Sequence, residues 1–117
     1  MTKIHLTSRA LDDIQEIYDY SLDEWGEQTA LKYIQTFEDA FSLLQEHKGL
    51  LKVNEKISSR FRVYAVQKHF LICDIIEDNI FVLTVKHVSM NLLEHLKELE
   101  SGLDEEAKAL HKRIKRQ

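Results

Sequence analysis

The stretch VLTVKHVSMN, from Val82 to Asn91, decides how this chain folds. It begins like a buried strand, carries Lys86 and His87 side by side at its end, and then passes into a leucine-spaced segment. A strand followed by a helix explains this order, with Asn91 as the helix cap, because asparagine is favoured at that position. Lys86 and His87 are then either acid-base groups that face a substrate or packing residues at a strand-to-helix corner.

Two similar runs precede this stretch. Residues 60–66 and 70–76 are rich in valine, isoleucine and phenylalanine, and short polar breaks separate them from each other and from residues 80–88. Such runs predict a three-stranded antiparallel meander. Cys73 lies inside the second run, where we expect a small buried hydrophobe. The short alternating segment of residues 3–7 predicts an additional N-terminal strand.

Between the first strand and the meander, apolar residues recur every three or four positions, which is typical of amphipathic helices. The first predicted helix has an apolar face of Leu11, Ile14, Tyr18, Leu22 and Trp25, and we expect Trp25 in the core. The second has an apolar face of Ala30, Tyr33, Ile34, Phe37, Phe41 and Leu44. Because Gly26 separates them by a tight break, the two helices predict an antiparallel hairpin.

Leucines after Asn91 predict a third helix. We expect residues 1–100 to form one domain and residues 101–117 to form a C-terminal extension that is helical and then frays. The predicted fold class is α+β: an N-terminal strand, an antiparallel two-helix hairpin, a three-stranded antiparallel meander and a C-terminal helix. We expect the helices to cover one face of the antiparallel sheet.

Composition narrows the function classes. The chain has 117 residues, one cysteine and a net charge of -4. No apolar run approaches the roughly 18 residues that span a bilayer, and the N-terminal sequence lacks the apolar region of a signal peptide. We therefore expect a cytoplasmic protein without a membrane partner. Acidic residues dominate positions 12–46 and basic residues dominate positions 48–69, which predicts one negative and one positive surface.

Strand alternation places Arg60, Arg62 and Tyr64 on one face of the sheet. Two arginines and a tyrosine in this pattern could contact phosphates and move a proton. Lys68 and Lys86 could extend the same positive area. The alternative is a solvated sheet face on which the tyrosine packs under the arginine side chains.

The same alternation aligns His87 with Phe81, Leu83 and Val85, so we interpret it first as a buried corner residue. Lys86 points to the opposite face, and the two residues cannot both face one site unless the strand bulges. The six histidines are scattered without the spacing of metal ligands. We therefore predict no metal and no other cofactor.

Several segments, taken in the order in which they occur along this chain, resemble the RelE/ParE superfamily of bacterial toxins. The ParE branch, whose members are often called plasmid stabilization proteins, is the most similar. The resemblance runs from about Ile4 to Leu96. Its residues are Leu11–Ile14, Tyr18, Trp25-Gly26, Ala30, Tyr33 and Phe37 in the helical hairpin, and Arg62, His69–Ile72 and His87–Asn91 in the sheet and its closing corner.

The resemblance implies the toxin of a type II toxin-antitoxin system, which a cognate antitoxin binds and neutralises. Members of the ParE branch inhibit DNA gyrase, whereas members of the RelE branch cut mRNA on the ribosome without a metal. The implied complex is a homodimer or a toxin-antitoxin heterotetramer. Antitoxin binding depends on the fold more than on chemistry, and apolar grooves of small domains commonly receive an extended partner segment.

The resemblance also implies roles for individual residues. Arg62 matches an arginine on the central strand, and His87, Met90 and Asn91 match the closing corner. The nuclease alternative has Arg60, Arg62, Tyr64, Lys86 and His87 as candidate catalytic residues, and Arg60, Arg62, Lys68 and Lys86 as target or nucleic-acid contacts. The arginine expected just before Met90 is Ser89 here. This departure leaves a third alternative, a non-toxic homologue that retains antitoxin binding.

Overall fold

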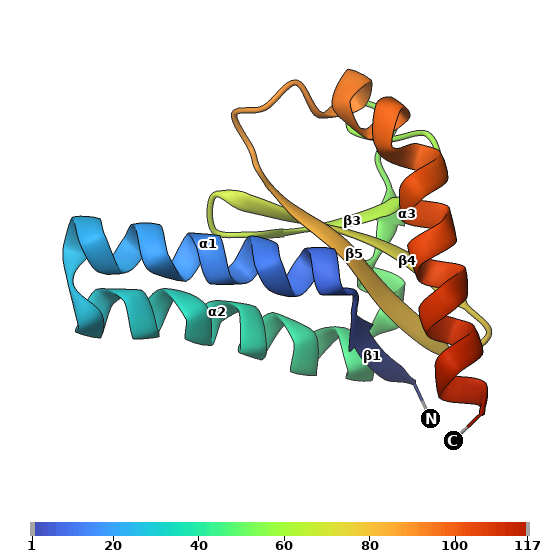
Figure 1. Ribbon diagram of the computed structural model, residues 1–117, viewed down its shortest axis with the longest axis horizontal. Helices are drawn as coiled ribbons and strands as arrows, with labels where there is room; N and C mark the ends of the chain where they lie inside the picture. Colours follow the sequence, from blue (N-terminus) through green and yellow to red (C-terminus); the bar gives the residue numbers. More distant parts are fainter. Residues whose placement is uncertain (1, 117) are drawn as a thin grey trace.

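The computed structural model describes residues 2–116, in which a sheet lies between a two-helix hairpin and one long helix (Figure 1). The elements are β1 (Lys3–Leu6), α1 (Ser8–Trp25), α2 (Glu27–Glu46), the 3-10 helix η1 (Lys48–Leu50), β2 (Lys52–Val53), β3 (Arg62–Val66), β4 (His69–Ile76), β5 (Asn79–His87) and α3 (Leu92–Lys115). The predicted α+β class is confirmed. Among the described residues, no helix is long and apolar enough to cross a membrane.

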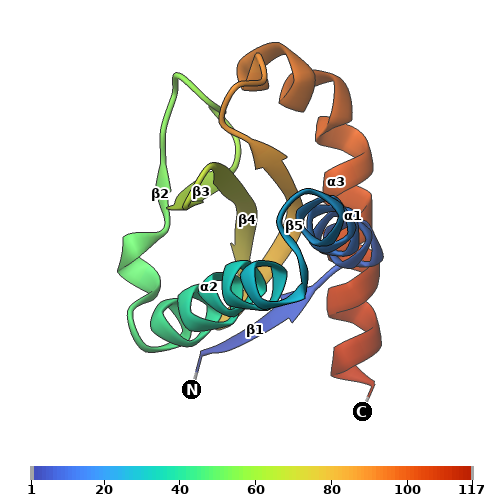
Figure 2. The ribbon, with the colours of Figure 1, turned by 90° about the vertical axis from the view of Figure 1, so that its left-hand side faces the viewer.

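The sheet has five strands in the order β1-β5-β4-β3-β2 (Figure 2). The predicted meander is present as β3, β4 and β5, but β2 pairs antiparallel with β3, and β1 pairs parallel with β5. The sheet is therefore larger than the predicted meander, because the unpredicted β2 and the predicted N-terminal strand also belong to it. With only two residues, β2 is too short to show an alternating pattern, and no local signal identifies the partner of β1.

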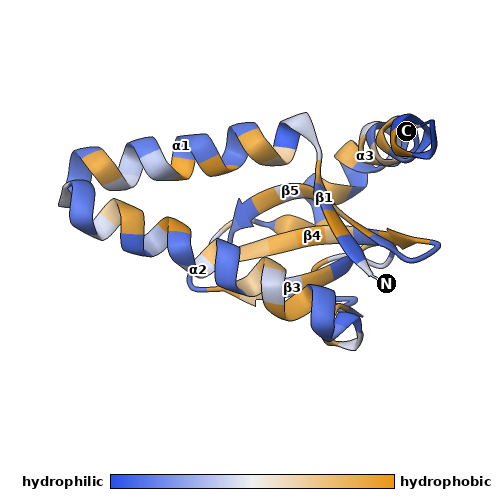
Figure 3. Cartoon of the chain, turned by 90° about the horizontal axis from the view of Figure 1, so that it is seen from below, coloured by the Kyte–Doolittle hydropathy of each residue, from blue (hydrophilic) through white to orange (hydrophobic). Residues whose placement is uncertain are grey.

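Both faces of the sheet are covered, which corrects the expectation of helices on one face. Leu71, Cys73 and Val82 pack in the core beneath the hairpin, whereas Phe81 and Leu83 pack in a second core beneath α3. A strand buried on both faces has a nearly continuous apolar sequence. Residues 80–85 have this character, and β4 and β5 are mostly hydrophobic along their length (Figure 3).

Helix α1 begins after Thr7, whose hydroxyl accepts the backbone N–H of Ala10 and so caps the helix. The inward face of α1 is Ala10, Ile14, Ile17 and Ser21, not the predicted stripe that ends at Trp25. Trp25 is 58% exposed, so its prediction as a core residue is wrong. Small residues at two inward positions let α1 approach the sheet closely, and larger apolar residues are left outside. The apolar face predicted for the second helix is confirmed in α2.

Helix α3 runs without interruption through Gly102 to Lys115. Asn91 occupies the N-cap position, as predicted, but its side chain donates to Glu94 and makes no capping hydrogen bond. Leu92, Leu96, Leu103 and Ala107 bury the inner face of α3 against the sheet. Ion pairs join its second half to other described elements, namely Arg9–Glu106, Arg60–Asp104 and Lys115–Glu77, and His111 lies 3.6 Å from Glu77.

Candidate functional site

A groove of about 780 Å³ lies between the helical hairpin and the neighbouring end of the sheet, and we call it the hairpin groove. Its walls come from α1, α2, the β3–β4 turn, the end of β5 and the segment that follows β5. Ile17, Tyr20, Trp25 and Met90 give it an apolar part. Lys68, His69, Lys86 and His87 give it a polar part. Tyr20 and Trp25 are 60% and 58% exposed and pack edge to face.

Two histidines face each other in the polar part. His69 and His87 are directly paired across β4 and β5, and their ring centroids lie 5.2 Å apart in an edge-on arrangement. The Tyr33 hydroxyl oxygen lies 2.8 Å from Nδ1 of His69. Nδ1 of His87 accepts the backbone N–H of Ser89 at 3.1 Å, and it lies 2.7 Å from the Ser89 hydroxyl oxygen. Both rings are thus held through Nδ1, at the side of an open groove.

Burial, together with the nearby His87, lowers the pKa of His69 to about 4. Burial likewise raises the pKa of Tyr33 above its ordinary value. At neutral pH the groove therefore contains a neutral imidazole and a protonated phenol at this position. Lys68 and Lys86 flank the histidines, and within residues 2–116 neither lysine forms an ion pair. The polar part is consequently an attractive place for a carboxylate or a phosphate.

The depressed pKa of His69 predicts that the protein loses stability as the pH falls. The unfolded chain protonates this histidine near pH 6.5, but the folded protein does so only near pH 4. Stability from this group is complete above pH 6.5 and decreases as the pH falls toward 4. Because the ring is partly exposed, we expect a loss of no more than about 2 kcal/mol.

Urea denaturation at pH 7 and pH 4 should test this expectation. His69→Gln should lose less stability between the two pH values than the parent protein. The exposed His47 provides the matched control, and His47→Gln should follow the parent protein. Equal losses in His69→Gln and the parent would contradict the assignment.

The structure corrects the prediction that His87 is a buried corner residue, because the residue is exposed and lines the hairpin groove. The alternation on which that prediction relied is broken in β5. Ile72 pairs with Thr84 and Cys73 pairs with Val82, so Leu83 is an extra residue. Beyond this bulge, Val85 belongs to the core beneath the hairpin. His87 and Lys86 both line the hairpin groove, although neighbouring residues of a strand point to opposite faces of the sheet.

Arg60 does not join the predicted positive area. It precedes β3, and its guanidinium donates to Asp74 at 2.9 Å and to Asp104 at 2.7 Å. These contacts tie α3 to β4, and the pKa of Arg60 is raised, chiefly by the hydrogen bond that it donates to Asp74. The guanidinium also lies 5.0 Å from the centroid of the Phe61 ring. Its position makes Arg60 a structural link on the α3 side of the sheet.

Arg62 and Tyr64 are also outside the hairpin groove. Arg62 is exposed on β3 and donates to the backbone oxygen of Leu51 at 3.1 Å. Tyr64 is half-buried and packs against the core beneath the hairpin. Of the predicted catalytic and contact residues, the structure brings together Lys68, Lys86 and His87, and it leaves Arg60, Arg62 and Tyr64 elsewhere.

Sequence reasoning missed the groove roles of Tyr20, Trp25 and Tyr33, as well as that of Asp13. Trp25 and Tyr33 fit an amphipathic pattern equally well as core residues, Tyr20 lies outside the predicted apolar face, and only the rotation of α1 separates Trp25 from the core. Asp13 had no distinguishing signal beyond its place in an acidic helix. Among the described residues, no group of three or more histidine, cysteine, aspartate or glutamate side chains is arranged to hold a metal ion.

Comparisons with known proteins agree on one family. Residues 4–92 match the family model described as the ParE toxin of the type II toxin-antitoxin system, parDE. The chain is 27% identical over 96 residues to "Toxin ParE1" of Caulobacter vibrioides, an alignment that covers 82% of this chain and 99% of that protein. A solved structure described as "Chromosomal ParDE TA system from P. aeruginosa" superposes with a TM-score of 0.67 at 20% identity, covering 76% of this chain and 98% of the other. This last similarity concerns the fold alone.

Proposed function

Because this chain belongs to the ParE toxin family of type II toxin-antitoxin systems, we propose that it is the toxin of such a pair and that a cognate antitoxin neutralises it by binding in the hairpin groove. The pair would act in the cytoplasm. The observation that carries the docking site is the groove itself, which combines exposed aromatic side chains with two lysines that form no ion pair with any residue from 2 to 116. Aromatic anchors of this kind commonly dominate protein–protein interfaces.

The chemistry of the groove defines the antitoxin segment that would fit. Bulky apolar side chains of the partner would cover Tyr20, Trp25 and Met90, and a carboxylate would lie near Lys68 and Lys86. Such a segment would be disordered or loosely structured alone and would fold on the toxin. A homodimer of the toxin and a toxin-antitoxin heterotetramer are both compatible with this arrangement.

We propose DNA gyrase as the cellular target, as in the ParE branch. The scattered positions of Arg60, Arg62 and Tyr64 support a toxin that binds its target over one that uses these residues to cut RNA. Purified toxin should inhibit supercoiling by gyrase in a dose-dependent manner, and an equimolar amount of antitoxin should restore it. Induced expression should produce filamentous cells with DNA damage. Undiminished supercoiling at saturating toxin would exclude gyrase as the target.

A specific observation favours a second candidate, metal-independent cleavage of RNA. His69 and His87 could exchange protons with a ribose hydroxyl and a leaving oxygen while Lys68 and Lys86 bind the phosphate. This set differs from the residues that the sequence pattern indicated. Primer extension on translated message after induction would reveal ribosome-dependent cuts, and His87→Gln should abolish them.

Growth assays separate these candidates from a non-toxic homologue. If clean induction leaves growth unaffected while the antitoxin still binds tightly, the chain retains the partner without the toxicity. Ser89, which hydrogen-bonds His87 where the family resemblance implies an arginine, is the position to examine first. Ser89→Arg would then be expected to restore growth arrest.

A further inference from the structure

The polar part of the hairpin groove depends on the bulge in β5. Phe81 and the bulged residue Leu83 face α3, and uninterrupted alternation would give Val85 and His87 the same direction. The extra residue reverses the alternation, so that Val85 joins the core beneath the hairpin and His87 meets His69. A β-bulge redirects side chains in this way at the ends of sheets and beside functional sites.

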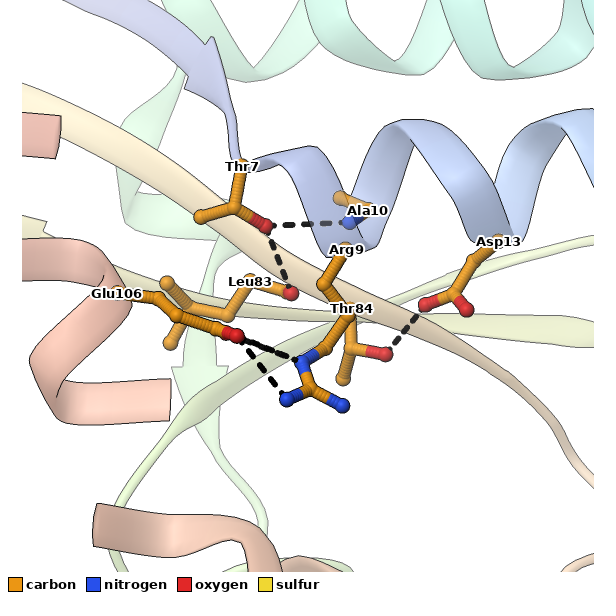
Figure 4. A network of polar contacts seen from close by, with 7 residues as sticks. All are labelled: Thr7, Arg9, Ala10, Asp13, Leu83, Thr84 and Glu106. Atoms are coloured by element: carbon orange, nitrogen blue, oxygen red, sulfur yellow. Dashed lines mark hydrogen bonds and ion pairs between the residues drawn. The ribbon is translucent and has the colours of Figure 1, made fainter. Parts of the chain in front are cut away.

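A bulge leaves backbone groups without ladder partners, and Thr7 and Asp13 supply partners for two of them. Figure 4 shows the contacts of Thr7 with Leu83 and of Asp13 with Thr84. The Thr7 hydroxyl donates to the backbone oxygen of Leu83 at 2.9 Å. The backbone N–H of Val85 donates to Oδ2 of Asp13 at 3.0 Å. The hydroxyl of Thr84, which is fully buried, donates to the same oxygen atom. Buried backbone groups without partners are unfavourable, so these contacts stabilise the bulge.

We propose that Asp13 is a positioning residue, which holds the β5 bulge and thereby directs His87 into the hairpin groove. One carboxylate oxygen accepts both hydrogen bonds, and the side chain reaches them from the helix that forms the opposite wall of the groove. The part of the proposal that concerns antitoxin affinity rests on the proposed function. The part that concerns the geometry of His87 does not.

Three variants separate positioning from other roles. Asp13→Ala removes the acceptor, whereas Asp13→Asn removes the charge but keeps an amide oxygen that can accept both hydrogen bonds. Asp12→Ala is the matched control. Asp12 is the neighbouring exposed acid, and the substitution removes the same negative charge at a position outside the hairpin groove. The full chain should be used throughout, labelled for NMR and titrated with the cognate antitoxin.

In Asp13→Ala we expect backbone amide shifts confined to residues 83–88 and loss of the nuclear Overhauser effect between the His69 and His87 rings. Antitoxin affinity should fall at least tenfold, while the amides of α3 keep their shifts. Asp13→Asn should restore the ring contact and most of the affinity. Asp12→Ala should resemble the parent protein in both measurements.

Two results would overturn the proposal. If Asp13→Ala retains the ring contact, the carboxylate does not hold the bulge. If Asp13→Asn has the ring contact of the parent but the affinity of Asp13→Ala, the carboxylate acts directly on the partner through its charge. A protein that shows the expected NMR changes but binds no antitoxin, even as the parent, would refute the proposed function and leave the positioning role intact.

Discussion

Leu103→Ala is expected to lower the free energy of unfolding by about 3 kcal/mol, within the range for buried leucines in well-packed cores. The side chain of Leu103 is 0% exposed and packs in the core that α3 forms with the sheet. The substitution leaves a cavity between the helix and the strands, and the ion pairs of Asp104 and Glu106 anchor the helix close to that cavity. Equilibrium urea denaturation, followed by circular dichroism, measures the change.

The matched control is Leu31→Ala, the same chemical change at a helical leucine that is 53% exposed. We expect it to change stability by less than about 0.5 kcal/mol. A chain that ends at Ser101 extends the test, because it loses Leu103, Ala107 and the ion pairs that Asp104, Glu106 and Lys115 form. We expect this chain to lose cooperative unfolding. A truncated chain as stable as the parent would show that residues 102–115 are an accessory extension.

Trp25→Ala is expected to weaken antitoxin binding by about 2 kcal/mol, or roughly 30-fold. Trp25 lines the apolar part of the hairpin groove, contacts Tyr20 edge to face, and leaves more than half of its surface exposed. Burying this surface under a partner would supply much of the interface energy. Calorimetric titration with the cognate antitoxin gives the affinity.

Because Trp25 contributes little to the core, the variant should remain folded, with a melting temperature within a few degrees of the parent. Leu11→Ala serves as the comparison, since Leu11 is an exposed apolar residue of α1 outside the hairpin groove. It should bind the antitoxin like the parent. If Trp25→Ala and Leu11→Ala weaken binding equally, the partner covers the outer surface of the hairpin and does not enter the groove.

These residues also show how much the sequence could predict. The hairpin, the three long strands and the third helix followed from periodicity and from Gly26, because those signals are local. The periodicity does not predict which face of α1 packs against the sheet, because α1 carries apolar residues on two sides. Only the packing against β5 determines that Ala10, Ile14 and Ser21 face inward. Trp25 was consequently placed in the core.

The candidate site was less predictable for the same reason. The sequence of β5 predicts regular alternation and gives no sign of the bulge. The contacts that stabilise the bulge come from Thr7 and Asp13, more than 70 residues away in the sequence. The sequence predicts a strand that already includes Arg60, and so places Arg60 and Arg62 on the same face. In the structure β3 begins at Arg62, and Arg60 contacts Asp74 and Asp104. Contacts between residues so far apart in the chain cannot be predicted from the local pattern of a single sequence.

The attachment of α1 to β5 has a consequence for the speed and strength of association. Asp13 and Thr7 join α1, one wall of the hairpin groove, to β5, and the Tyr33–His69 contact joins α2 to β4. If the antitoxin binds in the hairpin groove as proposed, the surface that this chain contributes is preorganised, and the loss of conformational entropy on binding falls mainly on the partner. Complex formation should then involve little induced fit in this chain, and its slow step should be the folding of the antitoxin segment.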